Sequence, residues 1–372
     1  MVCGPARRDD DGAMNTTATM SPRQRWLAIL RRQTPDRVPT DMWATPEVQA
    51  RLLRDLRCDS HEALNQRLNL DRPRIVEPHL RHHRHAQDPA FDFWGVRYRQ
   101  IVYGAGQYRE VECSPMAAFT SVAAVHRYPW PSPDDFDFTP VQDAAAAHDG
   151  FRILQGGMYE PFLRYGALRG LEQSYVDLLL NPDIADAILG HLFEFHFEYN
   201  RRIFEAADRR IDLICIAEDL GGQNGPLFSL DLYRRFFLPN QIRMADLARR
   251  YGVHVMYHTD GAVRAFLPDL VDKVGIEILN PIQWRCAGMD RMSLVHDFGD
   301  RLAFHGAMDN QQTLSFGLVN DVIAELRENL DIFSHARWIC APCHNLQTVT
   351  PTASIVALYE AIHNWGAAHV RK

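Results

Sequence analysis

The residues best suited to chemistry follow short apolar runs in the second half of the chain. His258 and Asp260 stand one residue apart in the segment HTDG, directly after the run VHVMY. Alternate side chains of an extended backbone point the same way, so this imidazole and this carboxylate can share one metal ion. The spacing leaves a second interpretation open, in which Asp260 caps the following helix and His258 is an ordinary polar residue.

A second group of such residues, Cys340-Ala-Pro-Cys343-His344-Asn345, follows the last apolar run. The pattern C-x-x-C-H formally matches a c-type haem attachment site, but that attachment usually takes place outside the cytoplasm and we find no export signal. A zinc ribbon needs a second C-x-x-C pair, which the sequence lacks. Cys343 and His344 therefore remain candidate metal ligands, with a buried thiol and a structural histidine as the alternative.

Two adjacent acids, Glu218 and Asp219, stand before the pair Gly221-Gly222. Neighbouring side chains at a strand end point to opposite sides, so at most one carboxylate faces a common site easily, and the glycine pair could let the backbone approach a ligand closely. We expect Glu218, Asp219 and His305 to be catalytic groups, with solvated turn acids as the alternative for the two acids. Polar side chains at the predicted strand ends are expected to bind substrate: Gln155, Gln223, Asn280, Gln283 and Asn345.

Repeated strand–helix units must position these residues. After residue 150, six short β-branched runs alternate with helical stretches, and further strands are expected near Arg37–Thr40 and Arg74–Glu77. That count reaches the eight strands of a (β/α)8 TIM barrel, in which strand carboxyl ends gather at one face. A doubly wound open sheet is the alternative, although no Gly-x-Gly-x-x-Gly follows a predicted strand. The runs are 151–157, 211–219, 253–261, 276–283, 301–309 and 337–345, and helices are expected over 181–207 and near 229–250, 261–274, 320–330 and 351–364.

We expect the first 150 residues to form mainly helical and β-ribbon additions to this α/β barrel. Residues 1–20 mix charges and predict a disordered tail, and Ser21-Pro22 then begins a helix with apolar residues at helical spacing. A second helix is expected in PEVQARLLRDL, and a short β-ribbon in FDFWGVRYRQIVYG. The Pro-rich segment 126–140 is the strongest linker signal, yet we expect one barrel domain over 21–372.

Composition narrows the class of partner. The 372 residues include 40 Lys plus Arg and 47 Asp plus Glu, which gives a formal net charge of −7. This mildly acidic balance favours a small-molecule substrate over nucleic acid or an anionic membrane surface. Seven scattered cysteines suit a reducing cytoplasm, and no run approaches the ~18 apolar residues that span a bilayer. We therefore expect a cytoplasmic protein without nucleic-acid or membrane partners.

Longer stretches resemble the uroporphyrinogen decarboxylase superfamily. The resemblance is strongest in HTDGAVRAFLPDLVDKVGIEILNPIQWRCAGMDRMSLVHDFGDRLAFHGAMDNQ and WICAPCHNLQTVTPTASIVALYEAI. RQRWLAILRRQTPDRVP, DFWGVRYR and AEDLGGQNGPLFSLDLYRRFFLP are similar too, so it covers residues 21–365. It implies a single (β/α)8 barrel and one of two chemistries, which are cofactor-free decarboxylation of a porphyrinogen and zinc-dependent methyl transfer involving corrinoid carriers. It also hints at a homodimer.

The resemblance favours the methyltransferase branch. True decarboxylases carry an Arg-rich RQAGRY-type segment that grips substrate carboxylates, whereas the corresponding DRVPTDMWATPEVQA has no such cluster. The zinc site of the methyltransferases has the form His-x-Cys plus a later Cys, and the matching positions here are His258, Asp260 and His344, with Cys343 one place away. Glu218 is then a fourth ligand or the general acid/base. A ligand set without thiolates is a stronger Lewis acid, which suits an oxygen-bearing substrate.

The sequence thus predicts a zinc-dependent enzyme that transfers or removes a methyl group with a separate corrinoid protein. Metal-assisted decarboxylation is the alternative. Decarboxylation without metal needs a cationic pocket, and Arg152, Arg164 and Arg264 are the arginines near predicted strand ends that could supply it. A non-catalytic tetrapyrrole-binding protein is the remaining class.

Overall fold

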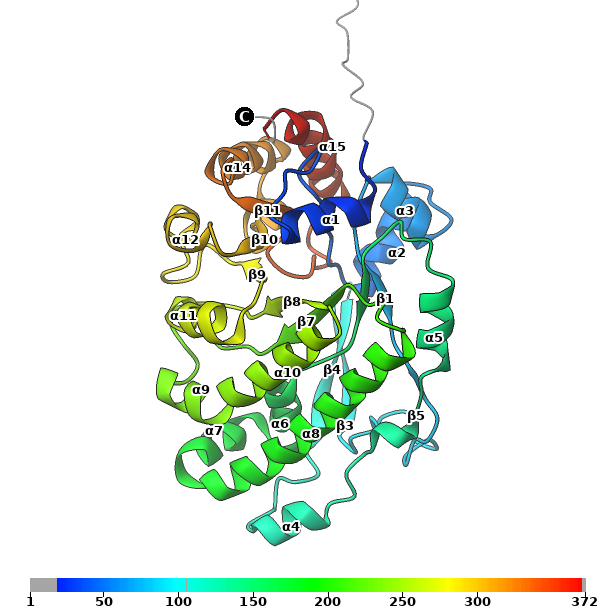
Figure 1. Cartoon of the computed structure of the whole chain (residues 1–372), viewed down its shortest axis with the longest axis vertical. Coiled ribbons are helices and arrows are strands. Elements are labelled where there is room, and N and C mark those ends of the chain that lie inside the picture. The colour runs from blue at the N-terminus through cyan, green and yellow to red at the C-terminus, as the bar shows by residue number, and fades with distance from the viewer. Residues whose placement is uncertain (1–18, 105, 370–372) are drawn as a thin grey trace, which may run out of the picture.

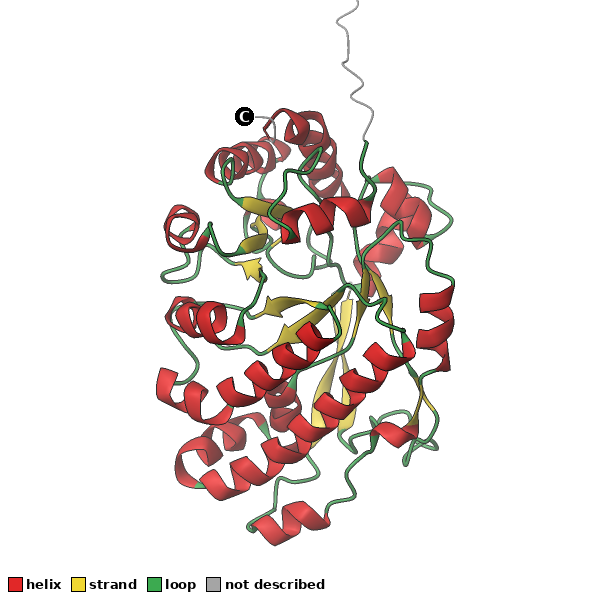
Figure 2. Ribbon diagram, in the orientation of Figure 1, coloured by secondary structure: helices red, strands yellow, loops and turns green. Residues whose placement is uncertain are grey.

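Seven parallel strands form the central sheet of the computed structural model, which describes residues 19–104 and 106–369 (Figure 1). Their order across the sheet is β1-β6-β7-β8-β9-β10-β11, so neighbours in the sheet follow one another along the chain. The strands are β1 Arg74–Val76, β6 Leu154–Gly156, β7 Leu213–Ala217, β8 His254–His258, β9 Ile278–Ile282, β10 Ala303–Met308 and β11 Arg337–Pro342. Helices surround this curled sheet (Figure 2), which confirms the predicted α/β class.

The predicted count of eight strands is not reached among the described residues. The segment expected as a strand at Arg37–Thr40 makes one parallel bridge, between Thr40 and Cys340 of β11. On its other side the Asp71 N–H donates to the Thr40 carbonyl at 2.8 Å. A regular strand does not form there, because Pro39 has no N–H to donate and the Asp41 side chain takes the Met42 N–H at 2.7 Å. The segment therefore lies beside β11 without extending the sheet.

The helices largely follow the predicted stretches. The predicted helix over 181–207 is α8, whereas 229–250 is divided at Phe237 and 261–274 is three short pieces instead of one helix. The helices are α1 Pro22–Leu30, α2 Pro46–Asp55, α3 His61–Arg67, α4 Val122–Arg127, α5 Thr139–Ala146, α6 Pro161–Arg169, α7 Leu171–Leu180, α8 Pro182–Ala206, α9 Leu230–Phe236, α10 Leu238–Arg250, α11 Leu267–Asp269, α12 Arg291–Phe298, α13 Thr313–Phe316, α14 Val319–Ile332 and α15 Thr352–His369, with single turns η1 Pro133–Asp135, η2 Arg264–Phe266 and η3 Leu270–Val274.

Two antiparallel pairs lie outside the parallel sheet. The predicted β-ribbon is the hairpin of β3 (Arg97–Tyr103) and β4 (Gly106–Cys113). The second pair joins β2 (His79–Leu80) to β5 (Phe136–Asp137) inside the Pro-rich segment 126–140. Asp134 in that segment forms an ion pair of 2.6 Å with Arg202 of α8.

Helix α1 fills the amino-terminal end of the sheet. Ser21 caps it through the Gln24 N–H, and Gln24 reciprocates to the Ser21 N–H, which confirms the predicted helix start. Its apolar residues pack against side chains at or near the starts of six strands. This inner cluster contains Trp26, Leu27, Ile29, Leu30, Ile153, Leu213, Met256, Ile278, Ala303 and Ile339.

Most of the predicted tail, residues 1–18, lies outside the described residues. Thr19 and Met20 both donate their backbone N–H groups to Asp36, at 2.9 Å each. Among the described helices, none combines the length and the apolar character needed to cross a membrane.

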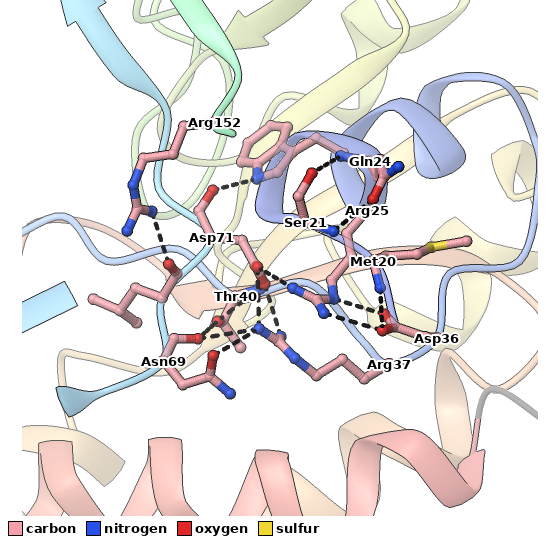
Figure 3. Close-up of polar contacts among 12 residues, drawn as sticks. Met20, Ser21, Gln24, Arg25, Asp36, Arg37, Thr40, Asn69, Asp71 and Arg152 are labelled. Carbon is pink, nitrogen blue, oxygen red and sulfur yellow. Dashed lines mark hydrogen bonds and ion pairs between the residues drawn. The ribbon is translucent and has the colours of Figure 1, made fainter. Parts of the chain in front are cut away.

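A buried cluster of charges fixes the segment beside β11 (Figure 3). Asp71 is 0% exposed and accepts bonds from Arg25 at 2.9 Å and from Arg37 at 2.7 and 3.0 Å. The Thr40 N–H donates to the same carboxylate at 3.0 Å, and Arg25 also pairs with Asp36. The carboxylate therefore connects α1, the Arg37–Thr40 segment and the approach to β1 at one point.

Removing this carboxylate should destabilise the fold strongly. Asp71→Ala leaves Arg25 and Arg37 buried without their shared partner, and breaking a buried pair in this way costs roughly 3–5 kcal/mol. Urea unfolding followed by circular dichroism measures the loss. As a control, Glu110→Ala removes an exposed partner of Arg99 on the hairpin and should change the unfolding free energy by less than about 1 kcal/mol. Equal losses in the two variants would contradict the role given to Asp71.

Candidate metal centre

Three side chains from two strand ends form a group that can hold a metal ion. His258 is the last residue of β8, Asp260 follows it by two residues, and His344 comes after β11. One potential ligand atom from each lies within 4.8 Å of the others, and all three side chains are half-buried. His344 Nε2 is 3.3 Å from Asp260 Oδ2. Two imidazoles and a carboxylate are a common donor set for zinc with an open fourth position, so the residues present fit this ion.

Neighbouring groups hold Asp260 in place. The Gln283 side-chain amide donates to Asp260 Oδ1 at 2.9 Å, and the Asp260 N–H donates to Asp219 at 3.3 Å. With Oδ1 engaged, Oδ2 faces His344. Burial raises the pKa of the Asp260 carboxyl above its ordinary value, although the nearby His344 and His258 act in the opposite direction. A bound cation would favour the ionised carboxylate here, since metal ligands bind in their deprotonated form.

The glycine pair after Asp219 allows two backbones to cross. A Cβ on Gly221 would lie 2.6 Å from the Ala262 nitrogen, and one on Gly261, whose φ is +84°, would lie 2.3 Å from the Gly221 carbonyl oxygen. The Ala262 N–H donates to the Gly222 carbonyl at 2.8 Å. The sequence predicted that this pair lets the backbone approach a ligand, whereas the close approach of Gly221 is made to the loop that carries Asp260.

A chain of polar side chains begins at Nδ1 of His258. His258 Nδ1 is 2.6 Å from Asn280 Oδ1, and the Asn280 amide nitrogen is 2.5 Å from His305 Nδ1. His305 Nε2 is in turn 3.0 Å from Asp41 Oδ2. The indole of Trp43 lies over His258, with ring centroids 5.2 Å apart. Asn280 and His305, predicted to bind substrate and to act in catalysis, are therefore buried behind the ligand group.

Glu218 is a buried carboxyl group beside the candidate ligands. It is 3% exposed, its Oε1 accepts the Phe162 N–H at 2.9 Å, and its Oε2 has no hydrogen-bond partner among the described residues. Burial raises the pKa of Glu218 well above its usual range, and the charges of Asp219 and Glu160 add to the effect, whereas the Phe162 bond opposes it. Asp219 is exposed, so of these two adjacent acids Glu218 is the one whose burial favours the protonated form.

Two cavities meet at the ligand group, and Asp260, His344 and Asn345 line both. One measures about 360 Å³ and is lined further by Trp43, Glu160, Leu163, Cys215, Ala217, Glu218, Asp219 and His258. The other measures about 380 Å³ and is lined further by Gln283, Asn310, Gln311, Ser315, Phe316, Gln347 and Val349. The first cavity is therefore rich in acidic side chains, and the second is rich in amide side chains.

Three predicted site residues lie elsewhere. Cys343 is 3% exposed and its thiol donates to the Ile282 carbonyl at 3.0 Å, so the structure does not bring it into the ligand group. Gln155 pairs with Leu213 at the start of β7, away from the strand ends that carry the ligands. Gln223 is exposed and donates to the Arg285 carbonyl at 3.3 Å.

The sequence analysis did not identify several residues of the site. Asp41 and Trp43 directly follow the predicted strand Arg37–Thr40, so the rule that polar groups gather after strands could have identified Asp41. Glu160, Asn310 and Gln347 lie in loops or at a helix start, and no local pattern marks them.

The arginines considered for a cationic pocket are engaged with other groups. Arg152 bonds to Glu62 at 2.9 Å and Arg164 to Asp92 at 2.9 Å, while Arg264 pairs with Asp297. Among the described residues that line the two cavities, none is lysine or arginine.

Comparisons with known proteins give the chain a family. The structure is similar to that of a methyltransferase from Methanosarcina mazei, with a TM-score of 0.68 and 19% sequence identity over 93% of this chain and 99% of that chain. An L-ribulose 3-epimerase has a TM-score of 0.41 and 12% identity over 65% of this chain and 83% of that chain. A 3-keto-D-glucoside 4-epimerase from E. coli has a TM-score of 0.37 and 13% identity, with coverages of 61% and 85%. No curated protein sequence matches.

The likeness to the methyltransferase supports the fold. Membership of a family rests on a separate finding, the match of residues 147–365 to the family model for uroporphyrinogen decarboxylase (URO-D). That match covers more than half of the chain and includes every residue of the ligand group. The chain therefore belongs to the uroporphyrinogen decarboxylase (URO-D) family.

Proposed function

We propose that this protein is a zinc-dependent enzyme that transfers a methyl group from a small oxygen-bearing substrate to a corrinoid carried by a partner protein. The observation that carries the proposal is the group formed by His258, Asp260 and His344, which borders a cavity of about 360 Å³ together with the buried acid Glu218. We also propose that residues 21–372 form one barrel domain, with the segment around Thr40 in the place of the eighth strand.

The donor set suits chemistry at oxygen. His258, Asp260 and His344 would hold zinc, which would supply Lewis-acid polarisation of a substrate oxygen. Gln283 fixes one oxygen of Asp260, and Glu218, whose burial favours the protonated form, lines the same cavity as the three candidate ligands. When the bond between the substrate oxygen and the methyl carbon breaks and the methyl group passes to a reduced, nucleophilic corrinoid, the bonding electron pair stays on the oxygen, and Glu218 would supply the proton that this oxygen needs.

The alternative function, decarboxylation of a small carboxylated or porphyrinogen-like substrate, fits the cavities less well. A carboxylated substrate is usually held by guanidinium or ammonium groups, and neither occurs among the described residues that line them. Membership of the URO-D family is compatible with both reactions, whereas the structural likeness to a methyltransferase supports methyl transfer.

The proposal predicts about one zinc ion per chain in protein that is purified without a His tag or chelator. His258→Ala and His344→Ala should each lose most of this metal, because each removes one of only three protein ligands. Elemental analysis of the folded proteins measures the ratio of zinc to protein.

A matched control lies at the opposite end of the same strand. His254 begins β8 and pairs with Glu277 at 2.8 Å, so His254→Ala should retain zinc like the parent protein. If the parent protein contains no zinc after attempted reconstitution, or if His344→Ala keeps its full zinc content, the assignment of His258, Asp260 and His344 as zinc ligands is wrong.

The buried proton on Glu218 predicts a pH dependence of stability. Because the folded-state pKa is raised, the folded chain binds this proton more tightly than the unfolded chain does. The free energy of unfolding therefore falls as the pH rises from the ordinary glutamate pKa, about 4.3, toward the raised value. Glu218→Gln should remove this decline, so the metal-free variant should be more stable than the metal-free parent at pH 8 and closer to it at pH 5.

Urea unfolding of both metal-free proteins at the two pH values measures this difference. With a substrate in hand, the same variant should turn over roughly 10²–10⁴-fold more slowly, since a general acid contributes about that much. Identical pH profiles for the two proteins would show that Glu218 is ionised in the fold and would rule out its role as proton donor.

A further inference from the structure

A chain of buried hydrogen bonds runs from the amino-terminal segment to one candidate ligand. It links Asp41 to His305 at 3.0 Å, His305 to Asn280 at 2.5 Å, and Asn280 to His258 at 2.6 Å. The first three side chains are 1%, 1% and 2% exposed. None of these three borders either cavity, so the chain does not contact substrate.

The charge on Asp41 fixes the direction of the first bond. Although burial opposes ionisation, the hydrogen bond from His305, the charge of Arg72 and the bond from the Met42 N–H hold the pKa of the Asp41 carboxyl below its usual value. An ionised carboxylate can only accept, and this one accepts from Met42 N–H at 2.7 Å, Trp43 Nε1–H at 3.0 Å and His305 Nε2. His305 therefore carries a proton on Nε2.

The remaining bonds follow from that proton. His305 Nδ1 faces the Asn280 amide nitrogen, which is a donor, so His305 Nδ1 must offer its lone pair. Asn280 then presents its carbonyl oxygen to His258, and His258 Nδ1 must carry a proton to donate to it. Nε2 is the ring nitrogen of His258 that keeps a lone pair for a metal.

We propose that Asp41, His305 and Asn280 are positioning residues that fix His258 as the Nδ1–H tautomer, so that its Nε2 lone pair is available to a divalent cation. The tautomer depends only on the buried chain. Its use in binding zinc rests on the function proposed above. Partners of this kind orient ligating histidines and typically change metal affinity by about 10–100-fold when removed.

The backbone of β10 is irregular at His305. The register of β10 against β9 shifts between Phe304 and Gly306, and the two residues after His305 have positive φ, +112° at Gly306 and +73° at Ala307. Bulges re-aim side chains next to functional sites, and an alanine at positive φ is kept only where its surroundings impose it. The Trp43 indole also contacts both imidazoles, with centroids 5.2 Å from His258 and 6.0 Å from His305.

The tautomer can be observed directly in the metal-free protein. Two-bond ¹H–¹⁵N correlation spectra of histidine-labelled protein, with His258 assigned by its absence in His258→Ala, distinguish protonated Nδ1 from protonated Nε2. We expect protonated Nδ1 in the parent. His305→Leu removes both polar atoms of the link and should yield a mixture of tautomers. Asp41→Asn should act similarly, because both oxygens of Asp41 accept hydrogen bonds. The NH₂ group of the asparagine replaces one of them and would face another donor, either the Met42 N–H or the N–H groups of Trp43 and His305.

Zinc affinity provides a second readout, measured by competition with a chelator. His305→Leu and Asp41→Asn should bind zinc about 10–100-fold more weakly than the parent. His305→Gln keeps one donor and one acceptor and should recover part of this loss. As a matched control, Tyr359→Phe removes a buried bond of 2.8 Å to the Asp41 backbone carbonyl, outside the chain of side chains, and should leave both tautomer and affinity unchanged.

Protonated Nε2 on His258 in the folded parent would overturn the proposal. Unchanged tautomer and affinity in folded Asp41→Asn and His305→Leu would overturn it too. If the parent shows protonated Nδ1 but binds no zinc, the positioning chain stands and the proposed function falls.

Discussion

The segment from Arg37 to Trp43 is held between β11 and Asp71 by buried charge, and the candidate site depends on that placement. Asp71 pairs with Arg25 and Arg37 and accepts the Thr40 N–H, which leaves the next residue, Asp41, facing His305. An ionised Asp41 sets the direction of three successive hydrogen bonds that end at His258. In the proposed chain, a cluster that stabilises the fold thus also determines which nitrogen of a candidate metal ligand is free.

Three carboxyl groups around the site have different proposed roles because their surroundings differ. Glu218 is buried with one oxygen unpartnered among the described residues, which favours its protonated form. Asp260 is held by Gln283 beside two histidines, where a cation would ionise it fully. Exposed Asp219 only accepts the Asp260 N–H. The same functional group can therefore serve as acid, ligand and support within one cavity, as burial and partners decide.

The sequence could predict what is local. Alternating strands and helices, the start of α1 and the two-residue spacing of His258 and Asp260 are properties of short windows, and the structure contains all three. The C-x-x-C-H pattern made His344 a candidate ligand, but its assignment to the same site as His258 came from the resemblance to a family, because no periodicity joins the two residues. The bond between Asp41 and His305 spans 264 positions and depends on how the segment beside β11 lies against β10, so no local motif predicts it. The glycine pair was expected to let the backbone approach a ligand, whereas Gly221 approaches the neighbouring loop.

X-ray absorption spectroscopy at the zinc edge of the zinc-loaded protein identifies the atoms that bind the ion. A site built from His258, Asp260 and His344 gives a shell of nitrogen and oxygen at about 2.0–2.1 Å, with the outer-shell scattering of two imidazoles and no sulfur. Loss of one imidazole in His344→Ala would agree with it. A sulfur scatterer at about 2.3 Å would mean that Cys343 or another thiolate binds the metal and would contradict a site built from His258, Asp260 and His344.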